Sequence, residues 1–266
     1  MDIFENQTDS LIEALNISAS SSFDLVELGA GDGSKTFKLL NRLIDLNIDF
    51  SYNPVDISSN SLKGLELMLS KKLPTLKVIK QEGDYFEILS KLKNSGRQKI
   101  VLFLGSNIGN MTDTIARDFI CKLGEQLNSN DRLLLGVDLI KPAEIVLAAY
   151  DDSQGVTAAF NLNLLHRINK EFIGNFDINN FVHSPIYSEE EAIAKSYIKS
   201  TTQQSVYLKK LNVTINFTKG ELIHTEISRK YNDKIIRHLL NKTNFTIDKK
   251  LTDSKGYFSD YILVRE

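Results

Sequence analysis

Glycine and acidic residues gather at residues 27–33, where the chain reads ELGAGDG. Glycine lets the backbone approach a ligand closely and adopt positive φ at no steric cost. The apolar run Phe23–Leu28 precedes this loop and a helical pattern follows it, so the first N–H groups of a helix are expected near the ligand. A glycine pattern alone is weak because many turns are rich in glycine. Between a strand and a helix, it indicates a cofactor-binding loop that includes Glu27, Gly29 and Gly31.

A further acid follows the loop at a spacing that suits recognition of a ribose. Asp56 stands at the end of the next apolar run, close to the ~20-residue distance at which such loops are followed by a ribose-binding carboxylate. The alternative is that Asp56 caps the helix that begins near Ser58, because aspartate is a favoured N-cap residue. We expect Asp56 to bind the cofactor.

The residue before the glycines distinguishes two kinds of cofactor. A nicotinamide-binding loop usually has an apolar residue where this chain has Glu27, and the E-L-G-x-G form resembles the first motif of class I methyltransferases. In that class an acid after the third strand serves the adenine, as Asp84 in the sequence Gly83-Asp84-Tyr85 would here. Gly105 and Ser106 would end the fourth strand beside the cofactor. Ligands bind at the carboxyl edge of such sheets. We therefore expect S-adenosylmethionine (SAM) rather than NAD.

The elements that must position these residues alternate regularly up to residue 139. Apolar runs typical of strands are separated by helical patterns, which predicts a parallel sheet with right-handed crossovers and helices on both faces, a Rossmann-like α/β fold. The expected strands are Phe23–Leu28, Ile48–Val55, Leu76–Ile79, Lys99–Leu104 and Arg132–Val137; the expected helices are residues 3–17, Lys35–Leu46, Leu62–Leu69, Phe86–Leu92 and Ile115–Leu127.

The regular alternation of strands and helices stops after Leu139 and resumes near Ile235. Two helices in succession are followed by strand-like stretches, and then by one helix and a pair of strands that suggest an antiparallel edge. The corresponding ranges are Pro142–Tyr150, Gly155–Glu171, Tyr197–Ile215, Leu222–Ser228, Ile235–Leu240, Phe245–Lys250 and Tyr257–Val264. We predict a SAM-binding domain of residues 1–139 plus 231–266, interrupted by an α+β substrate-binding insertion of residues 140–230.

The bulk composition excludes several classes of function. The chain has 32 basic and 34 acidic residues, a formal net charge of −2. It therefore has no excess of positive charge that would indicate binding to nucleic acid. No run of ~18 apolar residues predicts a membrane span, and the acidic first residues do not resemble a signal peptide. Cys121 has no partner for a disulfide, so we expect a cytoplasmic protein. The four histidines do not have the spacing of metal ligands, so we expect no metal site. The sequence also lacks a Gly-Lys-Ser/Thr phosphate-binding loop, which argues against a kinase or an ATPase.

Longer motifs point to a narrower resemblance. The segments 102–110 (LFLGSNIGN), 135–139 (LGVDL), 148–152 (AAYDD), 155–161 (GVTAAFN) and 225–228 (TEIS) are similar to the L-histidine Nα-methyltransferases of ergothioneine biosynthesis. That family also includes dimethylallyltryptophan N-methyltransferases. The resemblance spans most of residues 23–266 and implies a SAM-dependent N-methyltransferase acting on the α-amine of histidine or a histidine-like compound.

The resemblance also implies a role for particular residues. It assigns cofactor contacts to Gly29, Lys35, Asp56, Asp84 and Tyr85, the substrate amine and carboxylate to Asn110 and Tyr150, and the imidazole to Glu226 and Ser228, while Ser196 takes the place of a methionine that lines the pocket. The spacing of Glu226 and Ser228 independently suits two contacts with one ring, because residues i and i+2 of a strand point to the same face.

Each substrate assignment has a structural alternative. Asn110 could cap the helix expected at residue 115, Tyr150 could be a packed aromatic, and Glu226 could be a solvated strand residue. The alternatives for the whole chain are a cofactor-binding regulatory module and a methyltransferase for another small amine, such as a tryptophan derivative. Family members usually have a longer N-terminal segment that adds tyrosines to the pocket. We expect the helix at 3–17 or a neighbouring subunit of a homodimer to close the pocket here.

Overall fold

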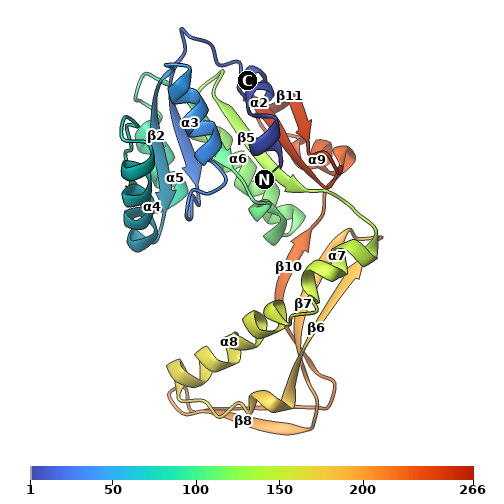
Figure 1. Ribbon diagram of the computed structural model, residues 1–266. Helices are drawn as coiled ribbons and strands as arrows, with labels where there is room; N and C mark the ends of the chain where they lie inside the picture. Colours follow the sequence, from blue (N-terminus) through green and yellow to red (C-terminus); the bar gives the residue numbers. More distant parts are fainter. Residues whose placement is uncertain (1) are drawn as a thin grey trace. The chain divides into compact units, whose positions relative to one another are not determined.

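The computed structural model describes residues 2–266, which form two compact units (Figure 1). Unit 1 ends its first part at Leu139 and resumes from Tyr231 to Glu266, and unit 2 is Ile140–Lys230. None of the helices in the described residues is long and apolar enough to cross a membrane.

Unit 1 is built on a seven-stranded sheet of order β11-β12-β5-β4-β1-β2-β3. Its strands are β1 (Ser22–Leu28), β2 (Asp49–Asp56), β3 (Gln81–Glu82), β4 (Gln98–Phe103), β5 (Arg132–Asp138), β11 (Phe245–Thr252) and β12 (Phe258–Arg265). The first five strands pair in parallel, whereas β12 runs antiparallel to both β5 and β11. The strand order reverses direction between β1 and β4, and open sheets of this kind bind ligands beside that point. The Rossmann-like fold and its antiparallel edge are confirmed.

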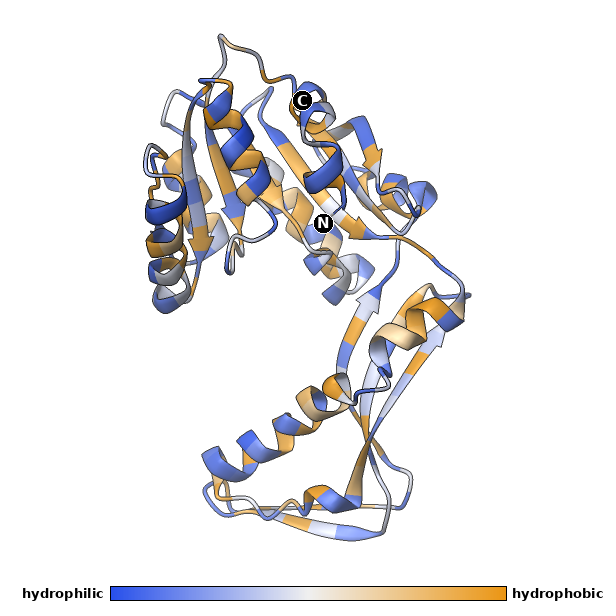
Figure 2. Cartoon of the chain, viewed as in Figure 1, coloured by the Kyte–Doolittle hydropathy of each residue, from blue (hydrophilic) through white to orange (hydrophobic). Residues whose placement is uncertain are grey.

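Helices cover both faces of this sheet. Successive strand residues alternate between two apolar clusters, so Leu25 packs in one cluster and Val26 in the other. The cluster with Leu25 includes residues from α1 (Asp2–Asn6), α2 (Thr8–Ala14), α3 (Phe37–Asp45) and α4 (Ser59–Lys72). The cluster with Val26 includes residues from α5 (Tyr85–Leu92), α6 (Asp113–Glu125) and α9 (Asp233–Leu240). Figure 2 shows the resulting hydrophobic strands beneath helices that carry hydrophilic residues.

The expected third strand is wrong in position. Residues 77–79 bond to Tyr52 on β2 from both sides, but the ladder then stops and resumes as β3 at Gln81. Pro54 supplies the reason, because proline has no N–H to donate where the next ladder bond would form. The expected lead-in helix at 3–17 is likewise divided into α1 and α2, which meet at Gln7.

Unit 2 is an α+β unit with its own apolar core. Its elements are α7 (Ala143–Tyr150), α8 (Val156–Phe172), a sheet of β6 (Phe181–Ser188), β7 (Ile193–Ser200) and β10 (Leu222–Arg229), and a hairpin of β8 (Gln204–Leu208) and β9 (Val213–Phe217). The sheet has the order β10-β7-β6 and is antiparallel. Strand β6 was not expected from the sequence. It contains Pro185, which a sheet tolerates at an edge, and β6 is an edge strand.

Candidate active site

The glycine loop after β1 adopts a conformation that side chains rarely accept. Gly29, Gly31 and Gly33 have φ values of 70°, 57° and 68°. A Cβ on Gly33 would lie 2.4 Å from Leu65 of α4, and one on Gly29 would lie 2.9 Å from the hydroxyl of Tyr85. Nothing lies within 4 Å of a Cβ on Gly31. Gly33 is therefore favoured by its positive φ and packs closely against α4, whereas the backbone at Gly31 has space beside it for a ligand.

Glu27 lies buried beneath this loop and is 3% exposed. Thr36 donates a hydrogen bond of 2.7 Å to Oε1, and the hydroxyl of Tyr52 donates one of 2.5 Å to Oε2. Burial raises the pKa of the Glu27 carboxyl, and burial together with the nearby Glu27 raises the pKa of Tyr52 well above its usual range. Both carboxylate oxygens thus hold the loop and the start of α3 in place. Direct contact between Glu27 and a cofactor stays a prediction.

Asp56 and Asp84 end the next two strands on the same edge. Ser58, not Asp56, caps α4 by accepting a hydrogen bond from the Ser61 N–H, so the capping interpretation of Asp56 is wrong. Oδ1 of Asp56 accepts from the Ser58 N–H at 2.8 Å. Asp84 caps α5 through Oδ1 alone, and within residues 2–266 no hydrogen bond reaches Oδ2 of either aspartate. Each carboxylate therefore keeps one oxygen for a ligand.

Tyr85 joins these acids to the glycine loop. Its hydroxyl approaches Gly29 closely, and its pKa is raised by burial first and then by the negative charges of Asp56 and Asp84. The predicted cofactor residues of three strand ends therefore lie together.

The end of β4 approaches the loop from the other side. Gly105 and Ser106 both have positive φ, and a Cβ on Gly105 would lie 2.5 Å from Nζ of Lys35. Ser106 Oγ accepts a hydrogen bond of 3.0 Å from the Asp138 N–H, which ties β4 to β5. Asn107, which sequence reasoning missed, has its amide 3.9 Å and 4.0 Å from the positions of Cβ atoms on Gly29 and Gly105. Its position two residues after Gly105 was the available signal.

Asn110 is exposed at the end of the short 3₁₀ helix Asn107–Asn110. The N-cap of α6 is Thr112, whose Oγ1 accepts from the Ile115 N–H at 3.4 Å. The interpretation of Asn110 as the cap of this helix is therefore wrong, and its contact with a substrate stays a prediction.

Tyr150 ends α7 in unit 2 and is fixed at both its backbone and its side chain. Its carbonyl oxygen lies 2.7 Å from Nε2 of His183, whose Nδ1 lies 2.8 Å from the Asn161 amide nitrogen. Because the amide nitrogen can only donate, Nδ1 accepts and Nε2 carries the proton. The phenol oxygen accepts a hydrogen bond of 2.9 Å from Nζ of Lys230. None of these three partners was given a role from the sequence: Asn161 ends the segment 155–161 that carries the family resemblance, whereas His183 and Lys230 belong to no recognised motif or spacing.

Glu226, Ser228 and Ser196 share one face of the unit 2 sheet. Glu226 lies directly opposite Ser196 in the β10–β7 ladder, and residues opposite one another or two apart on a strand point the same way. Glu226 is exposed, whereas the two serines are buried. A hollow of about 250 Å³ adjoins this face, lined by Glu226, Thr225, Phe160, Asn161, Asn163, Leu164 and Arg167. The face therefore offers a carboxylate to a small ligand.

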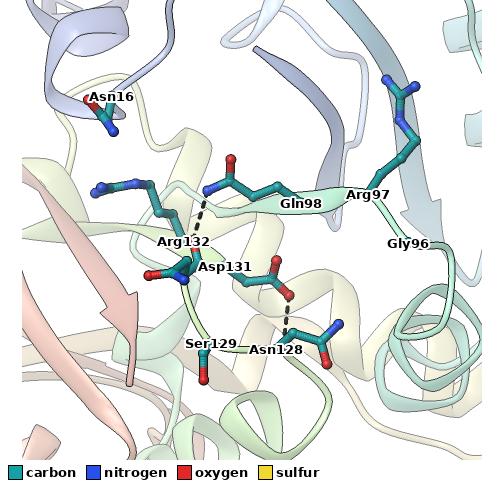
Figure 3. A pocket seen from close by; sticks show the side chains of 9 residues that line it. Asn16, Gly96, Arg97, Gln98, Asn128, Ser129, Asp131 and Arg132 are labelled. Atoms are coloured by element: carbon teal, nitrogen blue, oxygen red, sulfur yellow. Dashed lines mark hydrogen bonds between the residues drawn. The ribbon is translucent and has the colours of Figure 1, made fainter.

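A larger hollow of about 550 Å³ lies at the opposite, amino ends of β4 and β5 (Figure 3). Its polar groups already bond to one another: Gln98 donates to the Asn130 carbonyl, Asp131 accepts from the Asn128 N–H, and Arg132 pairs with Asp248. It holds none of the predicted site residues, and we assign it no role in binding.

Comparison with protein families finds a match along the chain. A family model described as histidine-specific methyltransferase, SAM-dependent, matches residues 1–265. A histidine N-alpha-methyltransferase from Mycolicibacterium smegmatis is 33% identical over 249 residues, covering 94% of this chain and 77% of that protein. The protein of the same name from Mycobacterium tuberculosis is 32% identical over 241 residues, covering 91% and 75%.

Solved structures support the fold at low sequence identity. A SAM-dependent methyltransferase from Clostridium acetobutylicum aligns with a TM-score of 0.52 and 14% identity, covering 98% of this chain and 92% of that one. A mitomycin 7-O-methyltransferase aligns with a TM-score of 0.51 and 13% identity, covering 97% and 54%.

Proposed function

This chain belongs to the histidine-specific, SAM-dependent methyltransferase family, and from that premise we propose that it transfers a methyl group from SAM to the α-amine of histidine. One observation carries the choice of substrate: Glu226 and Ser228 share a strand face beside a small hollow, where the pair suits the two nitrogens of an imidazole. The names of the relatives from Mycolicibacterium and Mycobacterium agree with this choice.

The residues at the carboxyl edge of the unit 1 sheet fit SAM. Asp56 and Asp84 each keep an oxygen for hydroxyl and amino donors, Lys35 offers a cation to a carboxylate, and the backbone at Gly31 is open. SAM supplies a methyl group on a sulfonium, which is already a good leaving group. The work left to the protein is to hold the amine in line with the methyl group, and such positioning can contribute ~7–11 kcal/mol.

The attacking amine must be neutral. Even the α-amino groups of peptides, with a pKa of ~8, are mostly protonated near pH 7, so the enzyme must bind the minor neutral form of the amine or remove its proton before transfer. We propose that the Asn110 side-chain oxygen accepts a hydrogen bond from the amine and so orients its lone pair. Tyr150 would donate to the carboxylate.

Recognition of the ring favours histidine over tryptophan. Glu226 can accept from one imidazole nitrogen while Ser228 donates to the other. An indole has one N–H and no acceptor nitrogen, so Ser228 would be left unpaired at a cost of ~1–3 kcal/mol. With its near-balanced charge, the chain has no basic surplus to attract nucleic acid, and we propose a free small molecule as the substrate.

The experiment is a comparison of Glu226→Ala with Glu190→Ala, which removes an exposed carboxylate of the same unit. We expect Glu226→Ala to lower kcat/KM for histidine by about tenfold or more, since it removes a hydrogen bond to a charged group. Glu190→Ala should match the parent. Undiminished histidine turnover by Glu226→Ala would refute the assigned role. Binding of S-adenosylhomocysteine with no turnover on any amine would instead favour a regulatory module.

A further inference from the structure

Lys230 is the residue that joins two parts of the proposed substrate site in unit 2. It follows β10, is 3% exposed, and is anchored by its backbone N–H, which donates to the Ala192 carbonyl at 2.7 Å. Its Nζ lies 2.9 Å from the hydroxyl oxygen of Tyr150 and 2.8 Å from Oγ of Ser228. One buried nitrogen thus touches both hydroxyl groups.

The chemistry of the lysine decides which way these two hydroxyls point. An ammonium group has three donors and no acceptor, so both oxygens must accept from Nζ. Each O–H hydrogen is then directed away from Lys230. Nζ also lies 4.9 Å from the centroid of the Tyr150 ring, which is within the range of a cation–π contact. A hydroxyl that could otherwise donate or accept is in this way committed to donating.

We infer that Lys230 is a positioning residue that fixes Tyr150 and Ser228 as hydrogen-bond donors, and so selects a substrate that has an α-carboxylate and an unprotonated ring nitrogen. This inference rests on the proposed function, because the substrate groups that accept from Tyr150 and Ser228 are those of histidine. Tyr150 donates to the carboxylate, and the nearby ammonium charge strengthens that contact. Ser228 donates to the ring nitrogen opposite the one that faces Glu226.

Loss of a lysine with a purely structural role would have a different effect on activity. If Lys230 served only to join α7 to β10, its loss would lower stability and impair every substrate alike. A residue that orients donors affects most strongly the substrate whose acceptors it serves. Histamine has the same ring and an amine but no carboxylate, so comparing it with histidine isolates the contact of Tyr150.

The first test measures kcat/KM for histidine and histamine with the parent, Lys230→Met, Lys230→Arg and the control Lys199→Met, which alters an exposed lysine of β7. We expect Lys230→Met to reduce the preference for histidine over histamine by about tenfold. The lower neutral fraction of the histamine amine applies equally to parent and variant. Lys230→Arg should restore part of the preference, and Lys199→Met should leave it unchanged. Adding Lys230→Met to Tyr150→Phe should reduce the preference by much less than it does alone.

The second test needs no turnover. Isothermal titration calorimetry measures the binding of histidine and of histamine in the presence of S-adenosylhomocysteine. Lys230→Met should weaken the binding of histidine by about tenfold more than the binding of histamine, because only histidine has a carboxylate that accepts from Tyr150. If Lys230→Met does not fold, Lys230→Gln, which keeps a donor but no charge, takes its place in both tests.

The outcomes separate the two proposals. A parent that methylates neither histidine nor histamine contradicts the proposed function, and the binding comparison then still decides whether Lys230 acts through Tyr150. Equal losses on both ligands, in turnover and in binding, would overturn the inference and leave Lys230 a structural residue.

Discussion

The hydroxyl of Tyr52 donates a hydrogen bond of 2.5 Å to Oε2 of Glu27, and both side chains are buried beneath the glycine loop. A buried carboxylate is costly unless donors surround it. Tyr52 and Thr36 supply these donors, so the acid that begins the loop motif is held by the neighbouring strand β2 and by the start of α3. The role of Glu27 that the structure supports is therefore to hold the conformation of the glycine loop.

Tyr52→Phe should lower the free energy of unfolding by about 1–3 kcal/mol, because it leaves Oε2 of Glu27 buried without its donor. Urea denaturation followed by circular dichroism measures this change. Tyr207→Phe is the matched control, since it removes a hydroxyl that bonds to Asn212 near the surface. Equal stabilities of the two variants would show that the Tyr52 bond does not support the loop.

Asp56→Ala should weaken binding of S-adenosylhomocysteine by about 10-fold to 150-fold, because ribose hydroxyls lose a charged acceptor worth roughly 1.5–3 kcal/mol. Isothermal titration calorimetry measures the affinity, with Asp45→Ala as an exposed control on α3. NAD should give no heat of binding. An affinity in Asp56→Ala equal to that of the parent, or binding of NAD, would contradict the cofactor assignment.

Asp260 on β12 makes stability depend on pH. It is 1% exposed, both its carboxylate oxygens lack a hydrogen-bond partner within residues 2–266, and burial raises its pKa from 3.8 to about 7. Lys35 and Asp253 line the same small cavity. The folded protein keeps this proton up to about pH 7, whereas the unfolded chain releases it near pH 3.8, so the folded state binds more protons between these values. The free energy of unfolding therefore falls as pH rises through that window.

Asp260→Asn removes this dependence. We expect the variant to gain stability relative to the parent as pH rises from 4 to 8, with an upper limit of about 4 kcal/mol set by the two pKa values. Urea denaturation at pH 4 and pH 8 gives the difference, and Asp45→Asn serves as the exposed control. A stability difference between variant and parent that is the same at both pH values would show that Asp260 is ionised throughout.

The sequence predicted most of the sheet because buried parallel strands are continuous apolar runs, as in Lys99–Leu104, and because glycines mark the strand ends. Prediction from the sequence failed where a proline alters the pairing of a strand or hides the strand pattern. Pro54 interrupts a ladder formed with residues more than 20 positions later, and Pro185 made an edge strand hard to recognise. Lys230, Asn107 and His183 escaped notice because burial and contact depend on tertiary packing, and an isolated lysine or histidine reads as a surface residue.

The most direct test of the central claim is methyl transfer from SAM carrying a ¹³C-labelled methyl group to histidine, with the product identified by NMR and mass spectrometry. We predict label on the α-nitrogen of histidine, and little or no product with tryptophan. Label on a ring nitrogen, or turnover confined to another amine, would contradict the proposed substrate.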